Sequence, residues 1–237
     1  IDLAFQGFPT EVKEETIENI KEKLKGRRKN LSKIAKTYLK TINKYQIVKG
    51  THKDDWFDIE RMPNGKTKVS VYRIKKGEKK DKFHEKIYVK KYTKEIWMYG
   101  LDDDDTFVVS GKGTQLIKIR IIGGQNKDTY QIENGKKVVV YDYKSKKNKF
   151  ITNKGRKKLT DDYETNVYNY KKVKYNSHQL LPSIGANPDD GLKIGLANTY
   201  IKNGFHQNPF TAKHTFSGNY YLATSGFEFD YSGEFAN

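Results

Sequence analysis

The stretch "RIIGGQNKDTYQIENGKK", residues 120–137, sets two glycines shortly before an aspartate and an aromatic residue, and it ends in a Glu-Asn-Gly turn. Residues of high β-propensity stand on both sides of the turn positions. Three interpretations are open: a calcium-binding repeat, a phosphate-binding loop, and a turn within a larger β-structure. The recurrence of the pattern elsewhere in the chain helps to decide between them.

The same pattern occurs three times, with the form G-x-x-x-x-D-x-[FY]-x-[IV]. Its glycines are Gly50, Gly100 and Gly123, and its aspartates are Asp55, Asp105 and Asp128. Glycine permits a sharp turn, the carboxylate can accept hydrogen bonds from turn amides, and the alternating apolar residues face one side of the strand that follows. The pattern therefore predicts one strand–turn–strand unit that is used three times.

The phrase "GGQNKDTYQ" also resembles the calcium-binding nonapeptide G-G-x-G-x-D-x-U-x of repeats-in-toxin proteins. Calcium takes about six to eight oxygen ligands, so several carboxylates must converge, and the candidate ligands are Asp103, Asp105 and Asp128. Asn126 and Asp103 replace the middle glycine, and the copies are spaced by 50 and 23 residues instead of lying in tandem. We therefore expect no continuous roll of stacked calcium turns, and we expect a solvated turn for the "DDDD" run.

Composition and motifs exclude several kinds of chemistry. The chain of 237 residues has no cysteine, which excludes disulfides, thiolate zinc sites and a cysteine nucleophile. A phosphate loop is disfavoured because Lys127 is followed by Asp128 instead of Ser or Thr. The net charge of +17 comes almost entirely from lysine and is accompanied by no nucleic-acid-binding motif, so we expect no nucleic-acid partner.

The distribution of charge and of turn residues predicts three segments. Residues 1–45 read as two short amphipathic helices, the first capped by Thr10 and ended at Gly26, and the second capped by Asn30. Residues 46–176 contain β-like runs separated by "MPNGK", "KKGEKKD" and "ENGKK", which predict hairpins. Residues 177–237 carry three lysines against five acidic residues, unlike the basic remainder, which predicts a domain boundary near residue 177.

The last segment alternates apolar and polar residues over consecutive runs. In "FEFDYSGEF", residues 227–235, aromatic residues alternate with acidic or small polar ones, and "GLKIGLANTY" and "HTFSGNYYLATSG" alternate in the same way. A soluble antiparallel sheet over a core can show this period. An aromatic-rich face opposite an acidic and small polar face favours the lipid and lumen sides of an outer-membrane barrel. Four strands are too few to close a barrel, so we expect these strands to pair with others or to lean on another element.

Residues 180–235, "LLPSIGANPDDGLKIG…FEFDYSGEF", resemble the first hairpins of barrels of the outer-membrane assembly-factor, or bacterial surface-antigen, superfamily. The runs "TKEIWMYGLDDDDTFVVSGKG" and "IKIRIIGGQNKDTYQIENGKKVVVYDYKSKKNKF" resemble the linker that joins such a barrel to a calcineurin-like metallophosphoesterase in large Bacteroidota proteins. The resemblance implies an outer-membrane location with a periplasmic N-terminal part. It implies contacts with outer-membrane lipid and with other outer-membrane or periplasmic proteins, and a role in outer-membrane biogenesis.

The resemblance does not extend to catalytic residues. The metallophosphoesterase motifs G-D-x-H and G-N-H-[DE] do not occur in this sequence, and the five histidines are scattered. We therefore assign no catalytic residue, and phosphoesterase activity is implied only for an upstream domain. The expected fold is mainly β with N-terminal helices: a β-hairpin-rich periplasmic domain, then the first antiparallel strands of a transmembrane β-barrel. The alternative is a secreted, calcium-stabilised β-module that acts as a binding domain. A second alternative, which rests on the charge alone, is a basic nucleic-acid binder.

Overall fold

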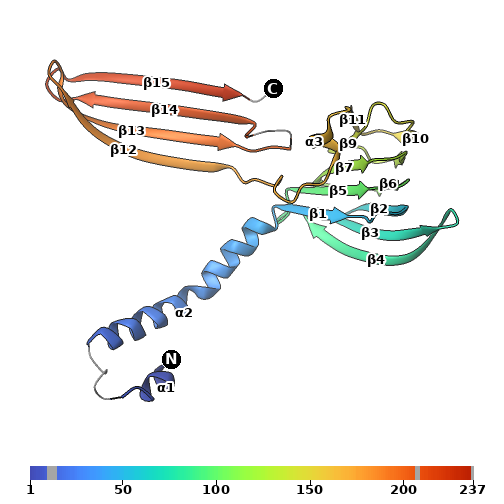
Figure 1. The fold of residues 1–237 in the computed structure, drawn as a ribbon, viewed down its shortest axis with the longest axis horizontal. Coiled ribbons are helices and arrows are strands. Elements are labelled where there is room, and N and C mark those ends of the chain that lie inside the picture. The colour runs from blue at the N-terminus through green and yellow to red at the C-terminus, as the bar shows by residue number, and fades with distance from the viewer. Residues whose placement is uncertain (10–14, 206–208, 236–237) are drawn as a thin grey trace. The chain divides into compact units, whose positions relative to one another are not determined.

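The structure, a computed structural model, describes residues 1–9, 15–205 and 209–235. The chain divides into two compact units, which we call unit 1 (residues 1–167) and unit 2 (residues 168–237). Both units are built mainly from β-strands (Figure 1). The expected mainly β fold with N-terminal helices is thus confirmed.

Unit 1 begins with two helices, α1 (Asp2–Gln6) and α2 (Glu15–Ile42). The prediction of a helix break at Gly26 was wrong, because α2 continues through Gly26 and through Asn30. An interior glycine costs a helix only about 1 kcal/mol, and the surrounding lysines, arginines and leucines are strong helix formers. The predicted cap Thr10 lies outside the described residues. No helix among the described residues is long and apolar enough to span a membrane.

The rest of unit 1 forms two sheets, which we call sheets A and B. Sheet A has the order β1 (Tyr45–Lys49), β5 (Glu95–Leu101), β7 (Lys118–Gly124), β9 (Val138–Asp142) and β11 (Arg156–Leu159). Sheet B has the order β10 (Lys149–Asn153), β8 (Thr129–Ile132), β6 (Thr106–Gly111), β2 (Asp55–Met62), β3 (Lys66–Lys75) and β4 (Glu78–Val89). All neighbours are parallel except β2–β3 and β3–β4. Because the chain passes back and forth between the two sheets, unit 1 is a two-sheet β-solenoid (Figure 1).

The prediction of a hairpin-rich domain was therefore only partly right. "MPNGK" and "KKGEKKD" do form the hairpin turns β2–β3 and β3–β4, and Asn64, Gly65, Lys76 and Gly77 all have the positive φ that tight hairpin turns require. "ENGKK" does not form a hairpin, because it joins β8 of sheet B to β9 of sheet A. In a solenoid, such a turn only changes the direction of the chain, and pairing occurs with the neighbouring coil.

The inference from the spacings of 50 and 23 residues, that the repeat copies do not lie in tandem, was also wrong, because the copies stack. Phe57, Phe107, Tyr130 and Phe150 occupy the same register position in four successive coils. Their ring centroids are 4.6, 5.5 and 4.8 Å apart from one ring to the next. The 50-residue spacing between the first two copies arises because the β3–β4 excursion is inserted between two stacked coils. Aliphatic residues of both sheets pack with this aromatic stack in a single core.

The short helix α3 (Tyr163–Asn166) ends unit 1, and the Asp162 side chain caps it by accepting the Thr165 backbone N–H at 2.8 Å. Unit 2 contains four strands: β12 (Ser177–Asn187), β13 (Gly191–Lys202), β14 (Ala212–Tyr221) and β15 (Gly226–Phe235). They pair in sequence order as an antiparallel sheet, which we call sheet C (Figure 1). The predicted antiparallel strands at the end of the chain are confirmed.

Candidate functional site

The aspartates of the repeat form a ladder inside the solenoid. The backbone N–H of Asp55 donates to Oδ1 of Asp105 at 2.8 Å, and the N–H of Asp105 donates to Oδ1 of Asp128 at 2.9 Å. The N–H of Asp128 donates to Oδ1 of Asn148 at 2.9 Å, so an asparagine ends the ladder. Each side chain thus satisfies a backbone amide of the preceding coil, where a turn leaves it without a strand partner. This inner ladder links four coils.

A second ladder runs in the opposite sense one residue earlier in each turn. The N–H of Asp104 donates to Oδ1 of Asp54 at 3.1 Å, and the N–H of Lys127 donates to Oδ1 of Asp104 at 3.2 Å. In this outer ladder, the carboxylate belongs to the preceding coil and the amide to the following one. The "DDDD" turn was predicted to be solvated, and Asp103 and Asp104 are indeed exposed. Asp104 and Asp105 also form hydrogen bonds that join adjacent coils.

The glycine of each repeat leaves room for the inner ladder. A Cβ atom at Gly100 would collide with Oδ2 of Asp105 and with the carbonyl oxygen of Gly123. A Cβ at Gly123 would collide with Oδ2 of Asp128 and with the hydroxyl of Tyr130. The repeat needs glycine there because the aspartate of its own turn folds back over the glycine backbone.

Burial governs the charge state of the ladder. The exclusion of water raises the pKa of Asp105 to about 10, and the neighbouring Asp128 charge acts in the same direction. Burial likewise raises the pKa of Asp128 to about 8 and that of Asp142, which accepts the Tyr130 hydroxyl at 2.5 Å, to about 6. At neutral pH, Asp105 and Asp128 are therefore held mainly as neutral carboxylic acids. A proton on Oδ2 leaves Oδ1 free to accept the backbone bond.

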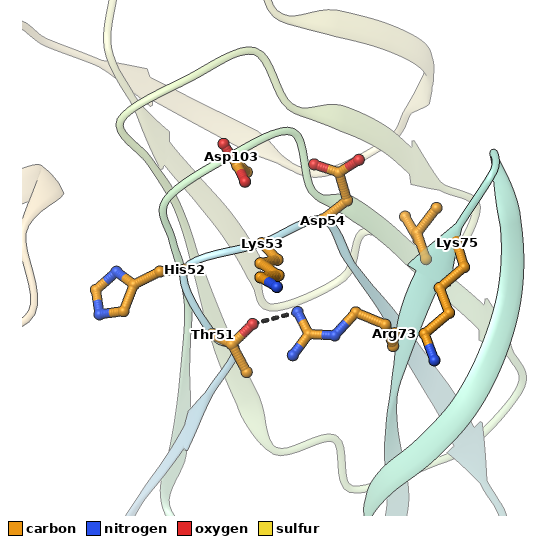
Figure 2. A pocket seen from close by; sticks show the side chains of 8 residues that line it. Thr51, His52, Lys53, Asp54, Arg73, Lys75 and Asp103 are labelled. Carbon is orange, nitrogen blue, oxygen red and sulfur yellow. Dashed lines mark hydrogen bonds between the residues drawn. The ribbon is translucent and has the colours of Figure 1, made fainter.

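An open pocket of about 560 Å³ lies beside the first ladder residues (Figure 2). Its lining residues are Thr51, His52, Lys53, Asp54, Arg73, Ile74, Lys75 and Asp103. The Arg73 guanidinium points toward Thr51 and donates to its hydroxyl, and it also pairs with Oδ1 of Asp55 at 2.9 Å. The arginine that gives this pocket much of its positive character is thus already engaged by the ladder. We assign the pocket a structural part in closing the first turn.

The predicted calcium ligands do not share one site. Asp105 and Asp128 meet in the buried ladder, whereas Asp103 is exposed, lines the pocket, and accepts a bond of 3.4 Å from Asn126. Among the described residues, no group of three or more His, Cys, Asp or Glu side chains is arranged to hold a metal ion. The observed donors do not fit a common cation site, and calcium binding stays a prediction.

Sheet C sorts its side chains onto two different faces. On β15, Phe227, Phe229, Tyr231 and Phe235 share one face, because alternate residues of a strand point the same way. Register places the following residues of the other strands on that face: Leu180, Pro182, Ile184, Ala186, Leu192, Ile194, Leu196, Phe216 and Tyr220. We call this the apolar face of sheet C. Its large side chains are exposed: 70% of Phe227, 79% of Phe229 and 56% of Tyr231.

The opposite, polar face satisfies its acids with partners on the neighbouring strand. Asn219 and Tyr221 of β14 donate to Glu228 of β15 at 2.9 and 2.6 Å. Lys213 pairs with Glu234 at 2.7 Å. Leu181 and Ile201 are aliphatic exceptions on this face, as the strand register shows. Sheet C thus has one hydrogen-bonded, charged face and one face that consists largely of exposed hydrocarbon.

Amphipathic rings form a row across one end of the apolar face. His178, Tyr200, His214 and Tyr231 follow one another over four strands, with ring centroids 6.1–6.4 Å apart. The His214 ring and the Tyr231 hydroxyl are 2.9 Å apart. Rings with an apolar body and a polar tip are suited to a boundary between water and hydrocarbon.

Three features of the site were not predicted from the sequence. A fourth repeat copy is present at Asn148 and Phe150, and it was hidden because asparagine replaces the aspartate and Tyr143 replaces the glycine. The pairing of Tyr130 with Asp142 has no counterpart in the repeat pattern. Arg61 is fully buried and was not singled out. A search for D-or-N-x-[FY] at intervals near 20 residues would have found the fourth copy.

Comparison with protein-family models, with curated proteins and with solved structures found nothing that matches this chain.

Proposed function

We propose that unit 2 is the membrane-contacting part of an outer-membrane β-barrel protein of the surface-antigen type, and that unit 1 is its periplasmic linker. The single observation that carries the proposal is the apolar face of sheet C, which leaves several large aromatic and aliphatic side chains exposed side by side. Such a face costs free energy in water and is stable against hydrocarbon.

The dimensions of sheet C support this proposal. Its strands contain 11, 12, 10 and 10 residues, and a strand that crosses a bilayer at a tilt needs about 9 to 11. The row of histidines and tyrosines at one end of the face fits the aromatic girdle that such strands place at the membrane surface. In the proposed barrel, the outer edges of β12 and β15 pair with further strands, since lipid cannot satisfy free backbone amides.

The role of unit 1 in the proposal is mechanical. Two ladders of hydrogen bonds and a continuous aromatic stack join its coils. The solenoid would therefore act as a rigid spacer that fixes the distance between its two ends. It would hold an upstream domain, a metallophosphoesterase by resemblance, near the periplasmic mouth of the barrel. This chain would then anchor the upstream domain to the membrane and would not itself catalyse a reaction. Phosphatase activity measured on residues 1–237 alone would contradict this assignment.

The membrane proposal is tested by comparing two adjacent residues on opposite faces. The chain has no cysteine, so Phe229→Cys and Asp230→Cys each create a single labelling site. Each variant is labelled with an environment-sensitive fluorophore and reconstituted in phosphatidylcholine vesicles that carry lipid-attached nitroxide quenchers. We expect the fluorophore at position 229 to be blue-shifted and quenched, and the fluorophore at position 230 to report water.

A second pair controls for local distortion. Ile194→Cys and Lys193→Cys repeat the comparison on β13, which lies two strands away from β15. Equal quenching at both members of each pair would rule out a lipid-facing side. If neither position is quenched and the chain stays in solution with the apolar face covered by a second protein, the soluble alternative replaces the barrel.

A further inference from the structure

The second half of α2, residues 27–42, has two chemically different faces. Four lysines recur at intervals of three or four residues and therefore share one side of the helix: Lys29, Lys33, Lys36 and Lys40. Leu31, Ile34, Tyr38 and Ile42 share the other side by the same rule. At 3.6 residues per turn, the two sets lie on opposite sides of the helix. This segment is a basic amphipathic helix.

Three of the four residues on the apolar side are exposed, and Ile42, at the end that leads into β1, is half-buried. The exposed fractions are 62% for Leu31, 59% for Ile34 and 64% for Tyr38. The first half of α2 is different, because Lys21 and Lys25 form ion pairs with Asp2 of α1 at 3.5 and 2.6 Å. Only the second half therefore presents both an open apolar side and an open basic side.

The positive charge of residues 27–42 indicates which kind of partner they bind. Residues 27–42 contain six basic residues and no acidic residue, so the partner must be anionic. A nucleic acid would engage the lysines and leave the apolar side in water. A second copy of the helix would cover the apolar side but would bring together two segments with six positive charges each, and Arg27, four residues before Leu31, lies on that side itself. An anionic lipid surface accepts both sides at once, since acyl chains meet the apolar residues and headgroups meet the lysines.

We propose that residues 27–42 of α2 lie in the surface of a bilayer that contains anionic phospholipid. This goes beyond the proposed function of sheet C, because the attachment is made by unit 1 and depends on headgroup charge. A sheet that contacts acyl chains is indifferent to that charge. The two contacts can therefore be separated by lipid composition.

The test is flotation of the full chain with vesicles of phosphatidylcholine alone and with vesicles that also contain phosphatidylglycerol. We expect phosphatidylglycerol to raise binding at least about tenfold at low salt, because each lysine near the surface adds to the attraction. Salt should reduce this gain, since exposed charges are screened over about 8 Å at physiological ionic strength. The quadruple variant K29Q/K33Q/K36Q/K40Q should lose the gain and keep any binding to phosphatidylcholine.

Two further variants sharpen the result. K127Q/K136Q/K146Q/K147Q removes the same charge from exposed positions of the solenoid and should keep the gain. The triple variant L31S/I34S/Y38S keeps all the charge and should bind phosphatidylglycerol vesicles at least about tenfold more weakly, since the apolar side no longer inserts. Circular dichroism checks that each variant retains its helix.

Three outcomes would overturn the proposal. The first is an undiminished gain in the α2 lysine variant, and the second is full binding by the apolar triple variant. The third is tighter binding of duplex DNA that depends on the same lysines and not on the apolar residues, which would identify a nucleic-acid partner. If the full chain does not bind vesicles of phosphatidylcholine alone but does bind vesicles that contain phosphatidylglycerol, the function proposed for sheet C is contradicted. The membrane contact proposed for α2 is then still supported.

Discussion

The backbone N–H of Asp105 donates a 2.9 Å hydrogen bond to the carboxyl oxygen Oδ1 of Asp128, one coil further along the solenoid. Both side chains are buried. An ionised carboxylate is costly to bury, but a protonated one is tolerated. The ladder therefore couples the stability of unit 1 to the protonation of residues that never reach solvent.

Unit 1 should lose stability as the pH rises. The folded-state pKa values of about 10 for Asp105 and about 8 for Asp128 lie above the ordinary value of 3.8, so both groups are protonated when folded and ionised when unfolded. Their contribution to stability is complete below pH 4 and is lost as the pH rises through the folded values. Urea unfolding followed by fluorescence of Trp56 and Trp97, both in unit 1, should give lower unfolding free energies at pH 9 than at pH 5.

Asp105→Asn should remove much of this pH dependence. The amide keeps an Oδ1 acceptor for the Asp55 N–H and cannot ionise, and Asn148 already fills the last place in the ladder. At pH 8 we expect the variant to be more stable than the parent by at least about 1 kcal/mol, the equivalent of less than one pKa unit. The matched control is Asp103→Asn on the exposed turn, which should leave the slope unchanged. An equal slope in Asp105→Asn would show that the ladder is not the titrating element.

Gly100 should tolerate no side chain, because its repeat turn packs against the next coil. Gly100→Ala would push a methyl group into Asp105 Oδ2 and the Gly123 backbone, so we expect a loss of about 2 to 4 kcal/mol in unfolding free energy. Gly26→Ala is the control, because no atom apart from the nearby backbone of its own helix lies within 4 Å of the added carbon, and alanine favours the helix by about 1 kcal/mol. A neutral Gly100→Ala would mean that the turn can relax away from the ladder.

These glycines also show what a single sequence can and cannot predict. The form G-x-x-x-x-D-x-[FY]-x-[IV] predicted a reused strand–turn unit, and Asp55, Asp105 and Asp128 do occupy equivalent places. It did not predict stacking, because the β3–β4 excursion separates the first two copies by a length that local patterns cannot distinguish from a change of fold. Pairing between coils is a long-range property. The hairpin at Asn64 and Gly65 was predicted because its information is local.

The two ends of the chain also differ in how well their structure was predicted from the sequence. The period of two in β13, β14 and β15 predicted the antiparallel strands, since the sheet keeps every side chain on the face that its parity assigns. The continuity of α2 was not predicted, because Gly26 is a weak signal that several strong helix formers on either side outweigh. Asp142 could not be identified at all from its sequence neighbours. Its role depends on Tyr130, twelve residues earlier and in the other sheet.

The aromatic stack should show a position-dependent cost of substitution. Phe107 is packed between Phe57 and Tyr130, with centroid distances of 4.6 and 5.5 Å, whereas Phe150 ends the stack and is only partly buried. We expect Phe107→Ala to cost about 3 to 5 kcal/mol and Phe150→Ala clearly less, because the latter leaves a smaller cavity. Urea midpoints of the two variants give the comparison. Equal costs would indicate that the stack does not act as a continuous core.

The guanidinium group of Arg61 should be required for the stability of unit 1. It is fully buried at the far end of β2, where Nη1 donates to the Ile117 carbonyl at 2.8 Å and to the Thr67 hydroxyl at 3.2 Å, and Nη2 donates to the Lys136 carbonyl at 3.4 Å. The Ile117 carbonyl directly precedes β7, and the Lys136 carbonyl lies just before β9. One guanidinium therefore links sheet B to the starts of two strands of sheet A. Burial lowers its pKa to about 10, which still leaves it charged at neutral pH.

Arg61→Lys keeps the charge but loses the planar fork that reaches both carbonyls. We expect a loss of about 2 to 3 kcal/mol in unfolding free energy, since a buried charge is left with fewer partners. The control Arg27→Lys, on the exposed part of α2, should change stability by less than about 0.5 kcal/mol. If Arg61→Lys were equally harmless, the guanidinium would not be the link between the two sheets, and the apolar core that residues of both sheets share would be enough to hold them together.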